Sequence, residues 1–120
     1  MKTVLRGDVV LVDYPYTDRT GSKVRPCVVV QSDDGNQRLD DTIVALMTSK
    51  TRFTLGSSNE LLITAQSPAR RKAGLIFDSA VQGQNLLTVD RSFLRRKNCV
   101  LSGDPMRQVD QCLKAALAPT

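Results

Sequence analysis

Arg25 is the residue of this sequence best placed to act on an anion. It lies between Val24 and a Pro-Cys-Val-Val-Val run at 26–30, at the mouth of a predicted buried strand. A planar guanidinium at such a position can hold a phosphate through two parallel hydrogen bonds. The alternative is a structural arginine that pairs with an acidic loop residue, and the pattern leaves both readings open.

Thr48 and Ser49 form a second candidate group, because they end an apolar run and precede a polar loop. Their hydroxyls could donate hydrogen bonds to the same phosphate that Arg25 would hold. The alternative is that two small polar residues simply terminate a strand.

The sequence contains no histidine, which excludes several mechanisms at once. A Ser-His-Asp triad, a Cys-His dyad and a zinc site with histidine ligands are all impossible. Acid–base chemistry would have to come from carboxylates, hydroxyls, thiols, lysine or arginine. The acidic pairs at 33–34 and 40–41 do not match the spacing of an EF-hand, so we predict no metal site and no cofactor.

The 120 residues predict a single domain, residues 1–120, with a formal charge of +5. Residues 1–60 carry 8 basic and 8 acidic side chains, whereas residues 61–120 carry 9 and 4. The excess positive charge therefore lies in the second half, chiefly at 70–72 and 91–97. Such a distribution suits a polyanionic partner, and the alternative is a set of solvated surface charges.

Three cysteines form no Cys-x-x-Cys pair and leave one over, which is typical of a reduced compartment. No apolar run approaches the ~18–20 residues that a membrane span requires. We therefore expect a cytoplasmic protein that does not bind a membrane.

Hydrophobic patterning predicts short strands followed by one helix. We expect a polar loop at 32–41 and an Asp90-capped helical turn at 90–94. Asp104 and Pro105 predict the start of a helix in which apolar residues recur every three or four positions to Leu117. This order argues for a mainly β fold, a small β-barrel with a C-terminal helix. The predicted strands cover 9–14, 24–31, 42–49, 60–64, 74–81, 85–89 and 99–101.

Three stretches together resemble the MazF/PemK (Kid) family of toxin endoribonucleases. They are Arg-Gly-Asp-Val-Val-Leu-Val-Asp at 6–13, Lys-Val-Arg-Pro-Cys-Val-Val-Val at 23–30 and Met-Thr-Ser-Lys at 47–50. The order and spacing of the strands fit this family over nearly the whole chain.

The resemblance implies an SH3-like β-barrel of the CcdB/PemK type, a homodimer and a cognate antitoxin. It also implies metal-independent cleavage of single-stranded RNA, usually mRNA, at short sequences. In the family the ribose 2′-hydroxyl attacks the adjacent phosphate and leaves a 2′,3′-cyclic phosphate and a 5′-hydroxyl. Operator DNA would be bound only through the antitoxin complex. A family of DNA gyrase poisons shares the fold, so the fold alone does not decide function.

The resemblance places the catalytic arginine on Arg25 and the catalytic threonine on Thr48, with Ser49 beside it. This assignment agrees with the interpretation of the residues themselves. Phe53 is a candidate to stack on an RNA base. The residues expected to contact RNA are Lys23, Lys50, Phe53, Arg70, Arg71, Gln82 and Gln84.

The sequence also departs from the family. Where some members carry an Arg-x-Asp acid–base pair, this chain has Gln82 and Gln84, and the arginine of the following strand is replaced by Leu87. Glutamine neither donates nor accepts a proton at neutral pH, so the general base is unassigned. These replacements motivate a second hypothesis, a catalytically weakened module that still binds antitoxin and operator DNA. A gyrase poison is the third, and the Arg25–Thr48 pair argues against it.

Overall fold

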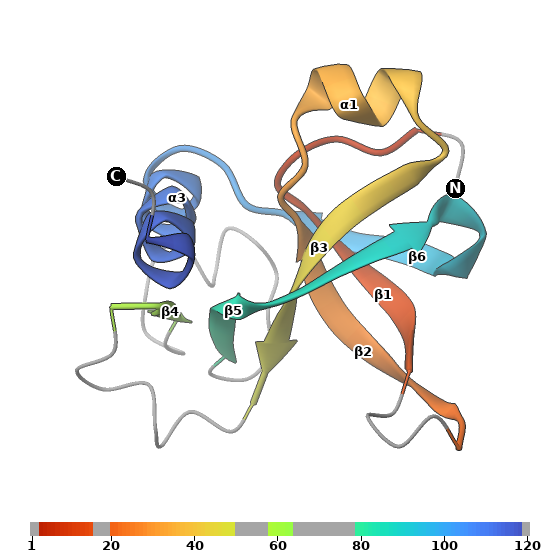
Figure 1. The fold of residues 1–120 in the computed structure, drawn as a ribbon, viewed down its shortest axis with the longest axis horizontal. Coiled ribbons are helices and arrows are strands. Elements are labelled where there is room, and N and C mark those ends of the chain that lie inside the picture. The colour runs from red at the N-terminus through yellow and green to blue at the C-terminus, as the bar shows by residue number, and fades with distance from the viewer. Residues whose placement is uncertain (1–2, 16–19, 50–57, 64–78, 119–120) are drawn as a thin grey trace.

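The computed structural model of the chain describes residues 3–15, 20–49, 58–63 and 79–118. Figure 1 shows a strongly twisted sheet, with a short helix over one end and a longer C-terminal helix beside the other. All strand pairs are antiparallel, and the order is β4-β5-β3-β2-β1-β6. The elements are β1 (Asp8–Pro15), β2 (Ser22–Val29), α1 (Asp33–Arg38), β3 (Asp41–Thr48), β4 (Glu60–Ile63), β5 (Ser79–Asp90), η1 (Arg91–Phe93), β6 (Leu94–Val100) and α3 (Asp104–Leu117).

The predicted mainly β fold with a C-terminal helix is confirmed. The expected barrel takes the form of a curled sheet, because no pairing among the described residues joins its outer strands β4 and β6. Pro26 lies inside β2, but β2 pairs with β3 only from Cys27 onward. Pro26 therefore falls where β2 has one neighbour, which is where a sheet tolerates proline.

Two predicted strand boundaries were wrong. The pieces expected at 74–81 and 85–89 meet in one strand, β5, with residues 74–78 outside the described part. The register of β3 against β5 shifts between Ala45 and Met47, so the polar stretch 82–85 bulges without ending the strand. The strand expected at 99–101 begins at Leu94, and the basic residues at 95–97 therefore lie on an outer strand, as is common at sheet edges.

The polar loop expected at 32–41 contains a helix, α1. Its N-cap is Ser32, whose side chain accepts a hydrogen bond from the Gly35 amide at 3.2 Å. Asn36 on this helix is buried and is held by polar contacts with Gln31 and Thr42. Because polar bonds rather than an apolar stripe hold α1, hydrophobic periodicity did not reveal it.

Two apolar clusters lie on opposite faces of the sheet. One lies under α3 and includes Val9, Val28, Met47, Val81, Met106 and Val109. The other includes Val10, Val12, Cys27, Val29, Val44 and Leu46. Because consecutive valines point to opposite faces, the valine runs of β1 and β2 fill both clusters.

Helix α3 packs through the side predicted from its spacing. Met106, Val109 and Cys112 are buried, whereas Leu117 at the end is 65% exposed. The helix begins at Asp104, as predicted, with Gly103 as its N-cap and Pro105 in its first turn. The helix ends at Leu117, with Ala118 in a left-handed conformation.

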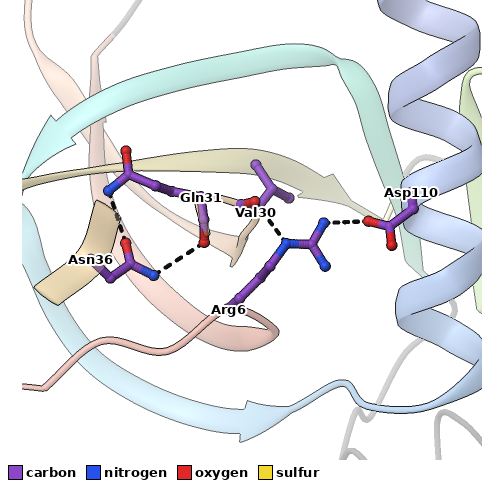
Figure 2. A network of polar contacts seen from close by, with 5 residues as sticks. All are labelled: Arg6, Val30, Gln31, Asn36 and Asp110. Atoms are coloured by element: carbon purple, nitrogen blue, oxygen red, sulfur yellow. Dashed lines mark hydrogen bonds and ion pairs between the residues drawn. The ribbon is translucent and has the colours of Figure 1, made fainter. Parts of the chain in front are cut away.

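The Arg6-Gly7-Asp8 turn ties the sheet to α3. The Arg6 guanidinium donates to the Val30 carbonyl at 2.9 Å and to the Asp110 carboxylate on α3 (Figure 2). The Gly7 amide donates to the Val29 carbonyl at 2.9 Å, and the Gly7 carbonyl accepts from the Leu101 amide at 2.8 Å. This turn therefore joins the end of β2, the chain after β6 and α3.

Gly7 is the position where a side chain would be least tolerated. Its φ is +96°, and an added Cβ would lie 2.4 Å from the Leu101 carbonyl oxygen. Gly103 also has a positive φ, but a Cβ there would meet nothing within 4 Å.

We expect Gly7→Ala to lower the free energy of unfolding by about 2–4 kcal/mol, because strain and overpacking add. Gly103→Ala, the matched control, should cost about 1 kcal/mol from backbone strain alone. Urea unfolding of both variants measures the difference. Equal losses would show that the close approach at Gly7 does not constrain the fold.

Candidate active site

Arg25 lies in β2, opposite Val12 of β1, and its side chain is half-exposed. By strand alternation it shares a face with Cys27, a buried member of the second apolar cluster. Lys23 lies two residues earlier on the same face, where it pairs with Tyr14. Among the described residues, no carboxylate forms an ion pair with Arg25. The structural alternative therefore has no acidic partner in this part of the chain.

Thr48 is the last residue of β3, and Ser49 follows it as an exposed residue in a bend. Cys27 of β2 pairs with Leu46 of β3 in antiparallel register. Extending that register by two residues sets Arg25 across from Thr48 at one end of the sheet. The two groups that the sequence predicts to act together therefore come from neighbouring strands and share a face.

The sheet curls at this end. The Tyr14 hydroxyl on β1 donates to the Asn85 side-chain oxygen on β5 at 2.6 Å. Three strand spacings of ~4.8 Å would separate these strands in a flat sheet. The contact thus bends the face that carries Arg25 and Thr48 inward and brings Asn85 toward them.

A polar network continues from Asn85 to β4. Asn85 donates to the Gln82 side-chain oxygen at 3.3 Å, and Gln82 donates to a Glu60 carboxylate oxygen at 3.0 Å. Gln84 donates to the same Glu60 oxygen at 2.8 Å. The two glutamines that replace the family's acid–base pair are therefore both held by a carboxylate from β4.

Sequence reasoning did not identify Glu60 or Tyr14 as site residues. The sequence patterns predict only that Tyr14 ends one strand and that Glu60 begins another. The amide side chains at 82–85 are unusual in a strand and could have marked a polar site. Their partner Glu60, 22 residues before Gln82, could not be identified from spacing. Four predicted RNA-contacting residues, Lys50, Phe53, Arg70 and Arg71, lie outside the described residues.

The basic residues of β6 have partners on β1. Arg95 pairs with Asp13 at 2.8 Å, and Lys97 with the buried Asp8 at 3.6 Å. Two cations of the basic second half are thus partly neutralised within the sheet. Lys23 and Arg25 share a face with Thr48, and neither forms an ion pair with a described carboxylate.

Burial controls the ionisation of the groups beside Arg25. Desolvation raises the pKa of the Cys27 thiol to about 12, against a smaller opposing effect of Arg25. Desolvation, and next the Cys27 charge, raise the pKa of Tyr14 above its ordinary value, while Arg25 lowers it. Both groups are therefore neutral at pH 7, and Arg25 lies within electrostatic reach of each.

Among the described residues, no three Cys, Asp or Glu side chains are grouped so that they could hold a metal ion. No helix in the same ranges is both long and apolar enough to cross a membrane.

The fold is that of the MazF-type toxins. A mycobacterial endoribonuclease solved in complex with its cognate antitoxin superposes with a TM-score of 0.76 at 18% identity, covering 98% of each chain. The Mycobacterium tuberculosis toxin MazF-mt6 gives 0.73 at 18% identity, covering 94% of this chain and 98% of that one. MazE–MazF from Deinococcus radiodurans gives 0.69 at 17% identity, again over 98% of each chain.

Sequence comparison extends this likeness from fold to family. Residues 5–117 match the family described as PemK-like, MazF-like toxin of type II toxin–antitoxin systems. Endoribonuclease MazF of Staphylococcus epidermidis is 31% identical over 115 residues, which are 95% of this chain and 91% of that protein. The chain belongs to the PemK/MazF family of toxin endoribonucleases.

The raised pKa of Cys27 predicts a loss of stability in alkali. The thiol has a pKa of about 12 when folded and an ordinary value of 9.0. Below pH 9 the Cys27 thiol keeps its proton in both the folded and the unfolded state, so its contribution to the free energy of unfolding does not change with pH. Between pH 9 and 12 only the unfolded state loses the proton, so stability falls as pH rises.

We expect the free energy of unfolding of Cys27→Ala to fall less steeply with pH than that of the wild type, by up to about 1.4 kcal/mol for each pH unit above 9. Urea unfolding at pH 7.5 and 10.5 measures it, with Cys99→Ala as the control because Cys99 is only partly buried. A Cys27→Ala protein with the wild-type pH slope would contradict the assignment.

Proposed function

We propose that this chain is an endoribonuclease that cleaves single-stranded RNA, above all mRNA, at a phosphate held by Arg25 and Thr48. The observation that carries the proposal is the pairing of Cys27 with Leu46, whose register, continued by two residues, sets Arg25 across from Thr48. Lys23 lies on the same face. Family membership supports the same class of activity. Recognition of a short sequence is part of the proposal, with Gln82 and Gln84 among the reading side chains.

The chemistry requires stabilisation of negative charge. The ribose 2′-oxygen attacks the adjacent phosphorus while the bond from phosphorus to the 5′-oxygen breaks. The 2′-hydroxyl proton passes to solvent water, and a proton from solvent reaches the departing 5′-oxygen. The products are a 2′,3′-cyclic phosphate and a 5′-hydroxyl end. Arg25 offers two parallel donors to the phosphoryl oxygens, and the Thr48 hydroxyl offers a third contact. Ser49 extends this donor set into the following bend.

Charge stabilisation by fixed donors makes a metal ion unnecessary for this step, so we propose that cleavage is metal-independent. Preorganised donors of this kind supply a large part of the rate in many enzymes. Neutral Tyr14 and Cys27 line the face without adding negative charge near the phosphate.

The proposal includes partners. We infer that a cognate antitoxin inhibits this chain in the cytoplasm, that the chain forms a homodimer, and that operator DNA is bound only through the antitoxin complex. The mycobacterial endoribonuclease was solved in complex with its cognate antitoxin, and the Deinococcus radiodurans structure is of MazE–MazF, which supports the first of these inferences. An acidic antitoxin segment would complement Lys23 and Arg25.

A weakened toxin that retains antitoxin binding is the second candidate function. The observation favouring it is that Gln82 and Gln84, in place of an acid–base pair, both donate to Glu60. Cleavage and antitoxin binding measured on the same preparation separate the two functions. Tight binding without cleavage would select the second.

We expect the purified chain to cut single-stranded RNA in excess EDTA and Arg25→Ala to slow the cut by ~10²–10³-fold, the cost of losing a preorganised donor. Thr48→Val should slow it as well. Arg38→Ala is the matched control, because Arg38 pairs with Asp34 on α1, away from Arg25 and Thr48. This variant should cut at the wild-type rate. End-mapping by mass spectrometry identifies the cyclic phosphate. Loss of cutting in EDTA, or normal cutting by Arg25→Ala, would refute this mechanism.

A further inference from the structure

Glu60 dictates the direction of every hydrogen bond in the polar network beside Arg25. Its carboxylate oxygen Oε1 receives hydrogen bonds from Gln82 at 3.0 Å and from Gln84 at 2.8 Å. An ionised carboxylate accepts hydrogen bonds and donates none. Both glutamines must therefore turn their NH₂ groups toward β4 and their carbonyl oxygens away from it.

The constraint passes along the network one residue at a time. Because the Gln82 carbonyl faces Asn85, Asn85 must present its NH₂ group there, at 3.3 Å. The Asn85 carbonyl is then left to accept from the Tyr14 hydroxyl, at 2.6 Å. All three bonds run in the same sense, from Tyr14 to Glu60. We call Glu60, Gln82, Gln84, Asn85 and Tyr14 the Glu60 array.

The array leaves hydrogen-bond acceptors for a ligand. The Gln84 carbonyl is turned away from Glu60 on an exposed residue. The Tyr14 proton is committed to Asn85, so its oxygen can still accept a hydrogen bond. Tyr14 lies opposite Lys23, on the face that carries Arg25, and the bonds of the array connect Tyr14 with Gln84. The amino and imino groups of unstacked RNA bases are donors that match such acceptors.

We propose that Glu60 is a specificity-determining residue, which orients the Glu60 array to read donor groups on single-stranded RNA bases next to the phosphate held by Arg25. This inference rests on the proposed function. Glu60 acts through the glutamines and Asn85, and is thus a positioning residue rather than a catalytic one.

A purely structural role explains the array less well. β4 already pairs with β5 through its backbone, from Glu60 opposite Gln82 to Ile63 opposite Ser79. Leu61 and Ile63 also pack into the apolar cluster under α3. The strand is thus held without the side-chain bonds of Glu60. Three neutral amides and a carboxylate on a half-exposed face are better suited to a polar ligand than to packing.

The test uses Glu60→Gln, which keeps the shape of the side chain but replaces a group that only accepts hydrogen bonds. A glutamine at 60 can donate as well as accept, so the amides of the array can take either orientation. The probe is a randomised pool of 2′-fluoro RNA octamers, which cannot be cleaved because the nucleophile is missing. Bound octamers are selected on the full-length protein and sequenced.

We expect the wild type to enrich particular bases and Glu60→Gln to lower that preference ~10-fold or more at the positions read. Melting temperature should be nearly unchanged. Asp34→Asn is the matched control, because it removes one negative charge from α1. It can strengthen overall RNA binding, but it should leave the base preference at every position unchanged. If Glu60 had only a structural role, Glu60→Gln would not change the base preference while leaving the melting temperature unchanged.

Gln84→Met is a second variant that does not threaten folding, because Gln84 is exposed. It should lose preference at a subset of the positions affected by Glu60→Gln. A wild-type profile in both variants, or no base preference in the wild type, would overturn the inference. A wild type that selects sequences as expected but cuts no RNA would refute the proposed cleavage and leave the role of Glu60 standing.

Discussion

The Arg6-Gly7-Asp8 turn is the constraint on which the rest of the structure depends. Only a residue without a side chain can hold φ at +96° while its Cα passes so close to the Leu101 carbonyl. That approach lets the Gly7 amide and carbonyl bond to Val29 and Leu101, and it directs Arg6 toward Asp110 on α3. The turn lies next to Val9 of β1 and Val28 of β2, the first pair of these two strands. It thus contacts the end of β2 that lies opposite to the end carrying Arg25.

The two ends of the sheet use polar side chains differently. At the α1 end, Asn36 is buried, and its side chain is bonded to Gln31 and Thr42 (Figure 2 shows the Gln31 contact). A buried network of this kind is stable only when its members are satisfied, and it specifies one arrangement of helix and strands. At the other end the Glu60 array is half-exposed. The same chemistry that closes one end of the fold leaves acceptors available to a ligand at the other.

Much of the fold could be predicted because its signals are local. The valine runs of β1 and β2 specify strands buried on both faces, and the spacing from Met106 to Leu113 specifies the packed side of α3. The Asp90 cap was also predicted, and its side chain accepts from the Ser92 amide at 2.8 Å. α1 was missed because polar contacts with Gln31 and Thr42, rather than periodicity, hold it. β5 was divided in two because its bulge interrupts the apolar alternation.

The sequence by itself determined which residue types could act on a phosphate: Arg25 at a strand mouth, Thr48 at a strand end, and no histidine to assist them. Only the tertiary structure decided that these two share one face, because the register between β2 and β3 is a property of paired strands. It alone also placed Glu60 against Gln82 and Gln84, and Tyr14 against Asn85. Those contacts join residues 22 to 71 positions apart. The bonds of Glu60 follow from the register of β4 against β5, and the Tyr14–Asn85 bond forms because the sheet curls. No local pattern encodes either.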